Sequence, residues 1–115
     1  MRITLSYKNK IFSLNARKCG YFDEAIGLMF QKRDNATALL FDFSGRKGLA
    51  LHSFFVFFPF LAIWLDDKNK ILEIRTVKPF SFNICPQKLF VKIIEIPINN
   101  KYKKIIQKVV GKRKV

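Results

Sequence analysis

The sequence predicts an α+β fold, mainly antiparallel β, in which a small, partly closed, barrel-like sheet carries two short helices. Several short segments alternate apolar and polar residues and are separated by turn residues. In the phenylalanine-rich middle of the chain, odd-numbered and even-numbered positions are both apolar. This predicts a strand that is covered on both faces. Apolar residues recur at helical spacing in two segments only. With 115 residues, half of them hydrophobic, the chain is expected to form a single domain, residues 1–115.

The chain opens with a predicted β-hairpin. Ile3 and Leu5 alternate with polar residues, and the alternation resumes at Phe12 after a Lys-Asn-Lys triplet. Asn9, in the middle of this triplet, tolerates the left-handed backbone that a tight turn requires. The same triplet recurs at residues 68–70. We therefore expect two antiparallel strands that meet at Asn9.

The next predicted elements are a short helix and a strand. Between residues 20–30 apolar residues recur at helical spacing, and Asp23 and Glu24 near the start favour the positive end of a helix. Polar residues end this helix, and residues 38–43 are predicted to form a strand. The glycines and basic residues at 44–48 suit a loop that turns the chain back.

The middle of the chain raises a choice between a membrane span and buried strands. From residue 48 to residue 65 the only ionisable side chain is that of His52. This run of 18 residues falls just short of the about 20 that a spanning helix needs, and Pro59 interrupts it. Turn residues follow at 66–70, and residues 72–76 alternate as a strand partner would. We therefore predict two strands that meet at Pro59, and no transmembrane span.

A further strand is predicted at residues 89–96, after an irregular crossing and before Pro97. Lys92 and Glu95 within it differ in parity, so a single register cannot expose both side chains to water. Either a β-bulge or a partly covered face resolves this conflict, and the pattern does not choose between them.

The C-terminal element is predicted to be an amphipathic helix. Asn99 or Asn100 is available as a cap, and Gly111 closes the helix. Its apolar residues recur at the spacing of one helical face: Tyr102, Ile105, Ile106, Val109 and Val110. We expect this face to pack on the core.

Positive charge is concentrated at the C-terminus. The formal net charge is +14, and residues 96–115 hold seven basic residues and no acidic one. The candidate contacts with an anion or nucleic acid are Lys101, Lys103, Lys104, Lys108, Lys112, Arg113 and Lys114. Such a strip can neutralise phosphates. It equally suits an acidic protein, an anionic membrane surface, or a helix face that meets only water. Tyr102 lies on the apolar face, which argues against stacking on RNA bases.

The residue types that catalyse reactions or bind metals are sparse. The chain has two cysteines, Cys19 and Cys85, and one histidine, His52, so a zinc site lacks ligands. Two free buried thiols or a disulfide are both compatible with this sequence. Cys19 follows two basic residues, which would favour the thiolate of an exposed cysteine. No catalytic residue, metal or cofactor is predicted, and a small enzyme built on Cys19 or His52 stays a third hypothesis.

Several short segments, in their order, resemble a known family. The first are Gly27-Leu28-Met29-Phe30, Leu39-Leu40-Phe41-Asp42-Phe43 and the stretch HSFFVFFP that starts at His52. The order continues through Trp64-Leu65-Asp66, Lys78-Pro79-Phe80 and Ile94-Glu95-Ile96-Pro97. With this order and spacing, the chain resembles uncharacterised protein family 0127, the domain of unknown function 192, in its archaeal form. The resemblance covers nearly the whole chain after Gly20.

The resemblance implies a small, soluble, β-rich domain without an established activity. Two positions depart from the family. An aspartate commonly follows the proline in the family, whereas this chain has Phe60-Leu61 after Pro59. An arginine usually follows the Gly-Leu-Met segment, whereas this chain has Gln31-Lys32. His52 matches a family position near the start of the central strand. A structural histidine, hydrogen-bonded at the mouth of the barrel, is its plainer interpretation. As a ligand contact, His52 is the best single candidate.

Two functions are therefore predicted. The first is a non-catalytic binding or interaction module, since the sequence has no phosphate-binding glycine loop, metal-ligand cluster or carboxylate pair apart from the turn residues Asp66 and Asp67. The alternative is a nucleic-acid-associated protein that uses the basic C-terminal helix. Its possible partner is a polyanion, either nucleic acid or an acidic protein. The first ten residues lack the apolar core of a secretory signal, so a cytoplasmic location is expected.

Overall fold

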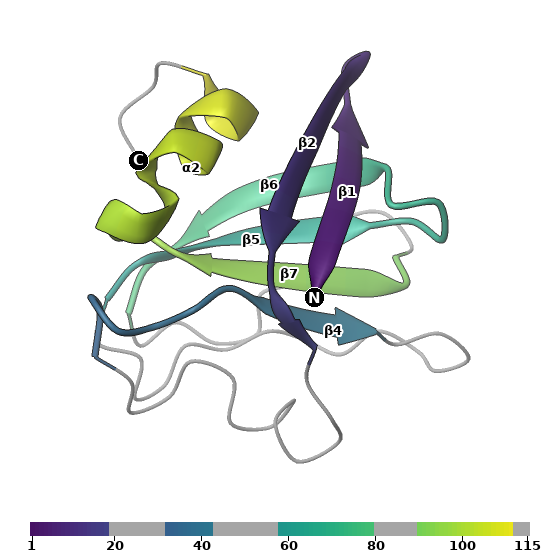
Figure 1. Cartoon of the computed structure of the whole chain (residues 1–115). Helices are drawn as coiled ribbons and strands as arrows, with labels where there is room; N and C mark the ends of the chain where they lie inside the picture. The colour runs from purple at the N-terminus through teal and green to yellow at the C-terminus, as the bar shows by residue number, and fades with distance from the viewer. Residues whose placement is uncertain (19–31, 43–57, 80–89, 112–115) are drawn as a thin grey trace.

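The computed structural model describes residues 1–18, 32–42, 58–79 and 90–111, and shows mainly antiparallel strands with one short α-helix among them (Figure 1). The strands are β1 Arg2–Tyr7, β2 Lys10–Asn15, β3 Arg17–Lys18, β4 Leu39–Asp42, β5 Phe60–Leu65, β6 Ile71–Val77 and β7 Lys92–Pro97. A 3-10 turn, η1 Asn100–Tyr102, leads into helix α2 Lys103–Val110. The α+β class, mainly antiparallel β, is therefore confirmed.

The strands form two sheets. Strands β1 and β2 make a two-stranded sheet, and the other five lie in the order β3-β4-β7-β5-β6. All pairs are antiparallel except β3 with β4. The predicted helix at residues 20–30, the loop at 44–48 and the start of the strand pair before residue 58 lie outside the described residues. Within the described parts, helical structure is confined to η1 and α2.

Strand β5 is covered on both faces, as its sequence predicts. All six of its side chains are buried. Leu61, Ile63 and Leu65 point to one face and join a mainly aliphatic cluster, which we call the hairpin-side core. Phe60, Ala62 and Trp64 point to the other face and join what we call the aromatic-side core. A fully apolar strand has no solvent face, so it takes an inner place in the sheet, between β6 and β7.

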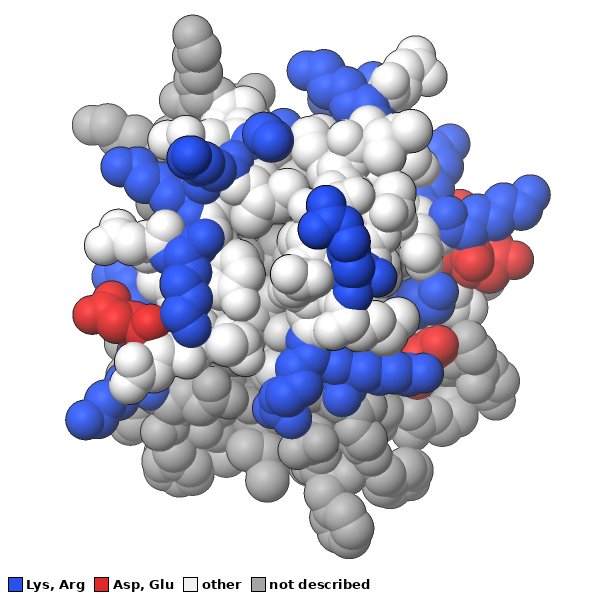
Figure 2. Space-filling model, in the orientation of Figure 1, with Lys and Arg blue, Asp and Glu red and all other residues white. Residues whose placement is uncertain are grey.

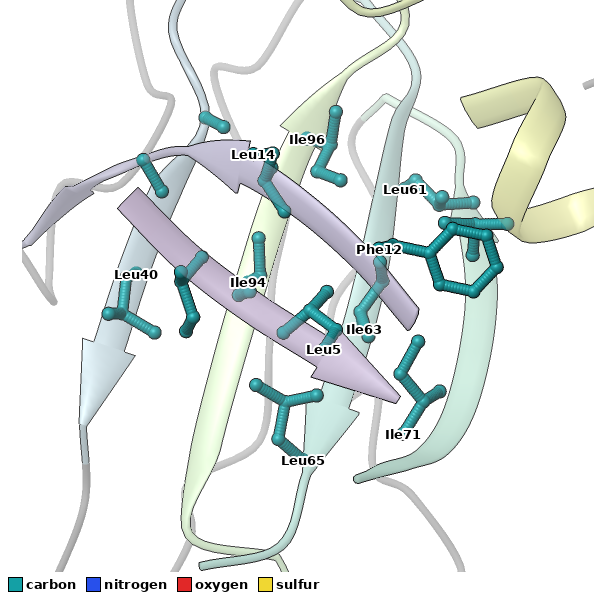
Figure 3. Packing of buried hydrophobic residues seen from close by; sticks show 14 of the residues in the cluster. Leu5, Phe12, Leu14, Leu40, Leu61, Ile63, Leu65, Ile71, Ile94 and Ile96 are labelled. Carbon is teal, nitrogen blue, oxygen red and sulfur yellow. The ribbon is translucent and has the colours of Figure 1, made fainter. Parts of the chain in front are cut away.

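The hairpin of β1 and β2 crosses over one face of the five-stranded sheet (Figure 3). Its inward side chains, which include Leu5, Phe12 and Leu14, pack on Ile63 and Ile94 of the sheet below in the hairpin-side core. The alternation of buried and exposed positions along β1 is that of a strand with one face in water. Burial of this face of the hairpin supplies the main stabilisation of the small sheet, because apolar area removed from water contributes about 25 cal/mol per Å².

The expected partly closed barrel is wrong, because the two sheets touch without merging. At one end the Ser6 amide donates to the Asn69 carbonyl (3.1 Å), and an isolated bridge joins Ser6 to Lys70. At the other end the Arg17 amide donates to the Ala38 carbonyl (2.8 Å), where the chain leaves β2 and enters the short β3. The hairpin covers the larger sheet as a second layer, which buries the apolar face without continuous strand pairing.

The hairpin turn follows the prediction. Lys8 and Asn9 have φ values of 49° and 64°, which place both central residues in the left-handed region. Such a turn matches the twist of the strands that it joins. Asn69, in the second Lys-Asn-Lys triplet, also has a positive φ of 62°. The central asparagine therefore has a left-handed backbone conformation in both triplets.

Helix α2 packs against β2 through the predicted apolar face. Ile106 and Val109 are buried, and the helix ends before Gly111, whose φ is 78°. Asn99 occupies the position before η1, yet its side chain makes no cap hydrogen bond. Instead its Nδ2 donates to the carbonyls of Arg33 (2.7 Å) and Ala36 (3.2 Å). Asn99 therefore holds residues 33–36 against the end of β7.

None of the described helices combines the length and the apolar character that crossing a membrane requires.

The Tyr102 hydroxyl connects the start of α2 to the backbone before β4. It accepts a hydrogen bond from the Ala38 amide at 2.7 Å, in a partly buried position. We expect Tyr102→Phe to lower the free energy of unfolding by about 1 to 2 kcal/mol, because the amide loses its acceptor. Urea denaturation followed by circular dichroism measures this change. Tyr7→Phe serves as the matched control, and an equal loss in both variants would contradict the role given to the Tyr102 hydroxyl.

Candidate functional site

The described part of the predicted basic strip lies on η1 and α2. Lys101, Lys103, Lys104 and Lys108 are all exposed. Lys112, Arg113 and Lys114 lie outside the described residues. The polar face of the helix therefore carries four lysines toward solvent, while the opposite face is held in the hairpin-side core.

The fold brings a second basic segment, at the N-terminus, next to this C-terminal strip. The sequence pattern alone does not show that these two segments are neighbours. Residues 1–18 carry five basic residues, and α2 packs on β2 within this segment. We call the combined set the basic layer: Arg2, Lys8, Lys10, Lys18, Lys101, Lys103, Lys104 and Lys108. All eight are exposed, and residues 1–18 and 98–111 contain no aspartate or glutamate. The fifth basic residue of the first segment, Arg17, pairs with Leu39 in the row of Glu95 and so belongs to the opposite face of the large sheet. Figure 2 shows basic side chains over this side of the molecule, with acidic ones only near its margins.

The basic layer offers phosphate-binding groups but few groups that stack on bases. Thr4 and Ser13 lie opposite each other on the outer face of the hairpin, with their hydroxyl oxygens 3.2 Å apart. Tyr7 is half-buried against the hairpin-side core, and Lys8 lies 5.1 Å from the centre of its ring. Tyr102 uses its hydroxyl for the backbone contact at Ala38. Such a surface is suited to a sugar-phosphate backbone, whose contacts need charge and hydroxyl groups.

Other sequence-predicted site residues are not placed by the structure. His52, the candidate ligand contact, lies outside the described residues, as do Cys19 and Cys85. The described part of the chain contains no group of three or more histidine, cysteine or acidic side chains that could hold a metal ion.

The most unusual ionisable group is a buried carboxyl on the opposite face of the large sheet. Glu95 lies on β7, between Leu39 of β4 and Ala62 of β5, with 4% of its surface exposed. Its side chain shares this face with the aromatic-side core. Burial strips water from the carboxylate and raises the pKa of Glu95 from 4.5 to about 8. At neutral pH the carboxyl is therefore mostly uncharged.

Three polar side chains of the neighbouring strands share this face. Trp64 lies one row further along β5 and is fully buried, and its Nε1 has no hydrogen-bond partner. Arg75 pairs with Ala62 in the row of Glu95, and its guanidinium lies 5.4 Å from the centre of the Trp64 ring. Glu73, opposite Trp64, forms an ion pair with Arg75. On the other side of Glu95, Arg17 of β3 pairs with Leu39 in the same row. Among the described strands, the charged groups that share this face with Glu95 are thus Glu73, Arg75 and Arg17.

Glu95 is not among the site residues predicted from the sequence, although its position relative to Lys92 signals a covered face. Lys92 and Glu95 differ in parity, and a covered face was one of the two predicted solutions. The structure confirms the covered face, since β7 keeps one register with both neighbours. Lys92 reaches solvent at the start of the strand, where its Nζ donates to Asn69 Oδ1 at 2.8 Å. A buried acidic residue with a raised pKa is a candidate functional group.

We expect Glu95 to make the stability of the protein fall as pH rises. Its pKa is about 8 in the folded state and about 4.5 in the unfolded chain, so the folded state binds the extra proton between these values. The free energy of unfolding should decrease by at most about 1.4 kcal/mol per pH unit across this window. Glu95→Gln should remove this slope and be more stable than the wild type near the upper limit. Urea denaturation at about pH 5 and about pH 8 measures both effects.

Asp67→Asn, a change at an exposed turn carboxyl, is the matched control for this experiment. It should keep the pH slope of the wild type. The same slope in Glu95→Gln as in the wild type would show that the carboxyl ionises freely in the folded protein.

Comparison with known proteins places this fold in a family. A protein of unknown function from Novosphingobium aromaticivorans DSM 12444 has a similar crystal structure, with a TM-score of 0.65 and 10% sequence identity. The similarity covers 90% of this chain and 76% of that one, and it shows the fold alone. No curated protein matches the sequence. The resemblance to the archaeal form and to family 0127 stays a prediction. The profile of DUF192, described as Uncharacterized ACR, matches residues 20–108, and the chain therefore belongs to the DUF192 family.

Proposed function

We propose that this chain is a non-catalytic binding module that holds nucleic acid through the basic layer. A cytoplasmic location is part of the proposal. The observation that carries it is that the layer has one sign of charge: its eight basic side chains are exposed, and residues 1–18 and 98–111 contain no acidic residue. A duplex carries one phosphate charge per about 1.7 Å of its axis, so a broad surface of one sign meets several phosphates at once and releases their counterions.

The placement of lysines on α2 supports binding over a merely solvated face. Lys103 and Lys104 stand in the first turn, where the helix has no acidic residue. Positive charge there opposes the helix dipole, and Lys104 also repels Lys108 one turn later. A helix that only had to meet water would be more stable with acidic residues at these positions. These lysines thus lower the stability of α2 locally while they keep the basic layer positive.

The layer favours contacts with the backbone over contacts with bases. Among the described residues of the chain, the large exposed apolar side chains are Met1 and Ile11, and neither is aromatic. Non-specific binding to unpaired bases relies mainly on stacking against exposed aromatic side chains. We therefore expect affinity that depends steeply on salt and little on base sequence.

Lys104→Glu tests the proposal because it should change stability and binding in opposite directions. The variant places an acidic residue in the first turn and turns the repulsion with Lys108 into attraction, so we expect a gain of about 0.5 kcal/mol in stability. Binding to a labelled oligonucleotide duplex should weaken several-fold, and the slope of log K against log salt should shrink by about 1 to 2. Urea denaturation and fluorescence anisotropy at several salt concentrations measure the two effects.

Two double variants separate the parts of the layer. Lys103→Ala with Lys108→Ala weakens the helix side, and Arg2→Ala with Lys10→Ala weakens the hairpin side. Both should reduce the salt slope. Lys68→Ala with Lys70→Ala, in the turn beside Asp66 and Asp67, removes the same charge and should leave the slope unchanged. Equal slopes in all three, or binding to anionic vesicles or acidic protein without binding to duplex, would refute a nucleic-acid role.

A further inference from the structure

The outer face of the hairpin carries a strip of small, uncharged polar side chains. Strands β1 and β2 turn the residues between their buried positions outward, in three rows: Arg2 with Asn15, Thr4 with Ser13, and Ser6 with Ile11. Most of these side chains are short and end in a hydroxyl or an amide. We call this set the polar strip: Thr4, Ser6, Ser13 and Asn15. Thr4 and Asn15 are exposed, and Ser6 and Ser13 are half-buried.

The basic layer surrounds the polar strip at both ends and along one side. Lys8 and Lys10 lie at the turn of the hairpin, and Arg2 lies at the opposite end. Helix α2 lies beside β2 and presents its exposed lysines to the same side of the molecule (Figure 1). Figure 2 shows basic side chains around uncharged ones on this side. A duplex has the complementary arrangement, since a groove of sugars and base edges separates two rows of phosphates.

The hydroxyl groups of the strip suit a partner that both donates and accepts hydrogen bonds. The oxygens of Thr4 and Ser13 are 3.2 Å apart, and either hydroxyl can donate to the other. Whichever one donates, the pair keeps one O–H donor and further lone pairs toward solvent. A phosphate oxygen uses only the donor. The ribose 2′-hydroxyl uses both, because it is itself a donor and an acceptor.

The breadth of the surface selects between the grooves of a duplex. The hairpin has the large sheet beneath it and α2 beside it, so its outer face is part of a broad layer. The minor groove of B-form DNA is only about 6 Å wide, and its major groove is about 8.5 Å deep. A broad layer fits neither shape. The minor groove of A-form RNA is wide and shallow, and it displays the 2′-hydroxyls.

We infer that the basic layer binds double-stranded RNA, with the polar strip against its minor groove and the hydroxyls of Thr4 and Ser13 on ribose 2′-hydroxyls. This inference rests on the proposed function and names the kind of nucleic acid. The lysines and Arg2 supply the affinity through the phosphates, and the strip distinguishes RNA from DNA.

Three duplexes of one sequence, made of RNA, DNA or 2′-O-methyl RNA, test the inference with the wild-type chain. Each has about 20 base pairs, more than the about 16 that a shape-specific RNA-binding domain spans. The 2′-O-methyl duplex keeps the A-form but lacks the hydroxyl donor. Fluorescence anisotropy should show RNA bound about fivefold tighter than the other two, the effect of one or two hydrogen bonds. The salt slope should be the same for RNA and 2′-O-methyl RNA, because their phosphates are the same.

A double variant removes the hydroxyls without changing charge. Thr4→Val with Ser13→Ala should bind all three duplexes as weakly as the wild type binds DNA, with an unchanged salt slope. Valine suits an exposed strand position, and circular dichroism checks the fold. Thr76→Val is the matched control, because Thr76 is an exposed hydroxyl residue on β6 outside the basic layer, and it should keep the preference for RNA.

The outcomes separate this inference from the proposed function. Equal affinity for RNA and DNA, equal affinity for RNA and 2′-O-methyl RNA, or a preference for RNA that survives in the double variant would each overturn the inference. The basic layer would then still be a surface for nucleic acid. Absence of binding to all three duplexes would refute the proposed function itself, and the inference with it.

Discussion

The covering of β5 on both faces is the constraint on which the structure depends. Every side chain of this strand is buried. Because side chains alternate along a strand, no register leaves one face of β5 in water without exposing large apolar groups. The sheet therefore needs a layer on each side. The hairpin of β1 and β2, together with α2, supplies the layer on one side (Figure 1).

The same constraint explains where the charge lies. The hairpin and α2 each have one face in the core, so their polar residues can only point outward. These two elements come from opposite ends of the described chain and carry no acidic residue. Packing them together concentrates positive charge on one side. Asp66, Asp67 and Glu73 lie on the turn and strand of the larger sheet, and Asp34 lies at the margin, next to Asn35, whose carbonyl accepts from Lys101. A field of one sign favours encounter with polyanions, and salt screens it within about 10 Å.

The two sides of the large sheet differ in their chemistry. The hairpin-side core is almost wholly aliphatic, with Phe12 as its one aromatic member among the buried residues. The aromatic-side core shares its face with the buried carboxyl of Glu95 and the unpaired indole of Trp64. An uncharged carboxyl avoids most of the cost of burying an ion, yet its hydrogen-bonding groups still require partners. The molecule thus has an ionic outer surface and, across the sheet, a neutral buried one.

Local patterns in the sequence determined the elements that depend on near neighbours. Period-two alternation and the Lys8-Asn9 turn predicted the first hairpin, and the apolar positions of Tyr102, Ile106 and Val109 predicted the face that α2 buries. Both properties arise from backbone geometry over a few residues, so they can be read from the order of residues.

Only the tertiary structure decided the relations between distant segments. It showed that the hairpin lies across the large sheet as a layer, where closure into a barrel was expected, because a two-residue β3 is all that continues β2 into that sheet. It joined the basic residues of the hairpin to those of α2. It also decided which of the two ionisable residues of β7 is buried: Glu95 is, and Lys92 is not. Alternation states that two residues face opposite ways, but which face is covered depends on segments far away in the chain.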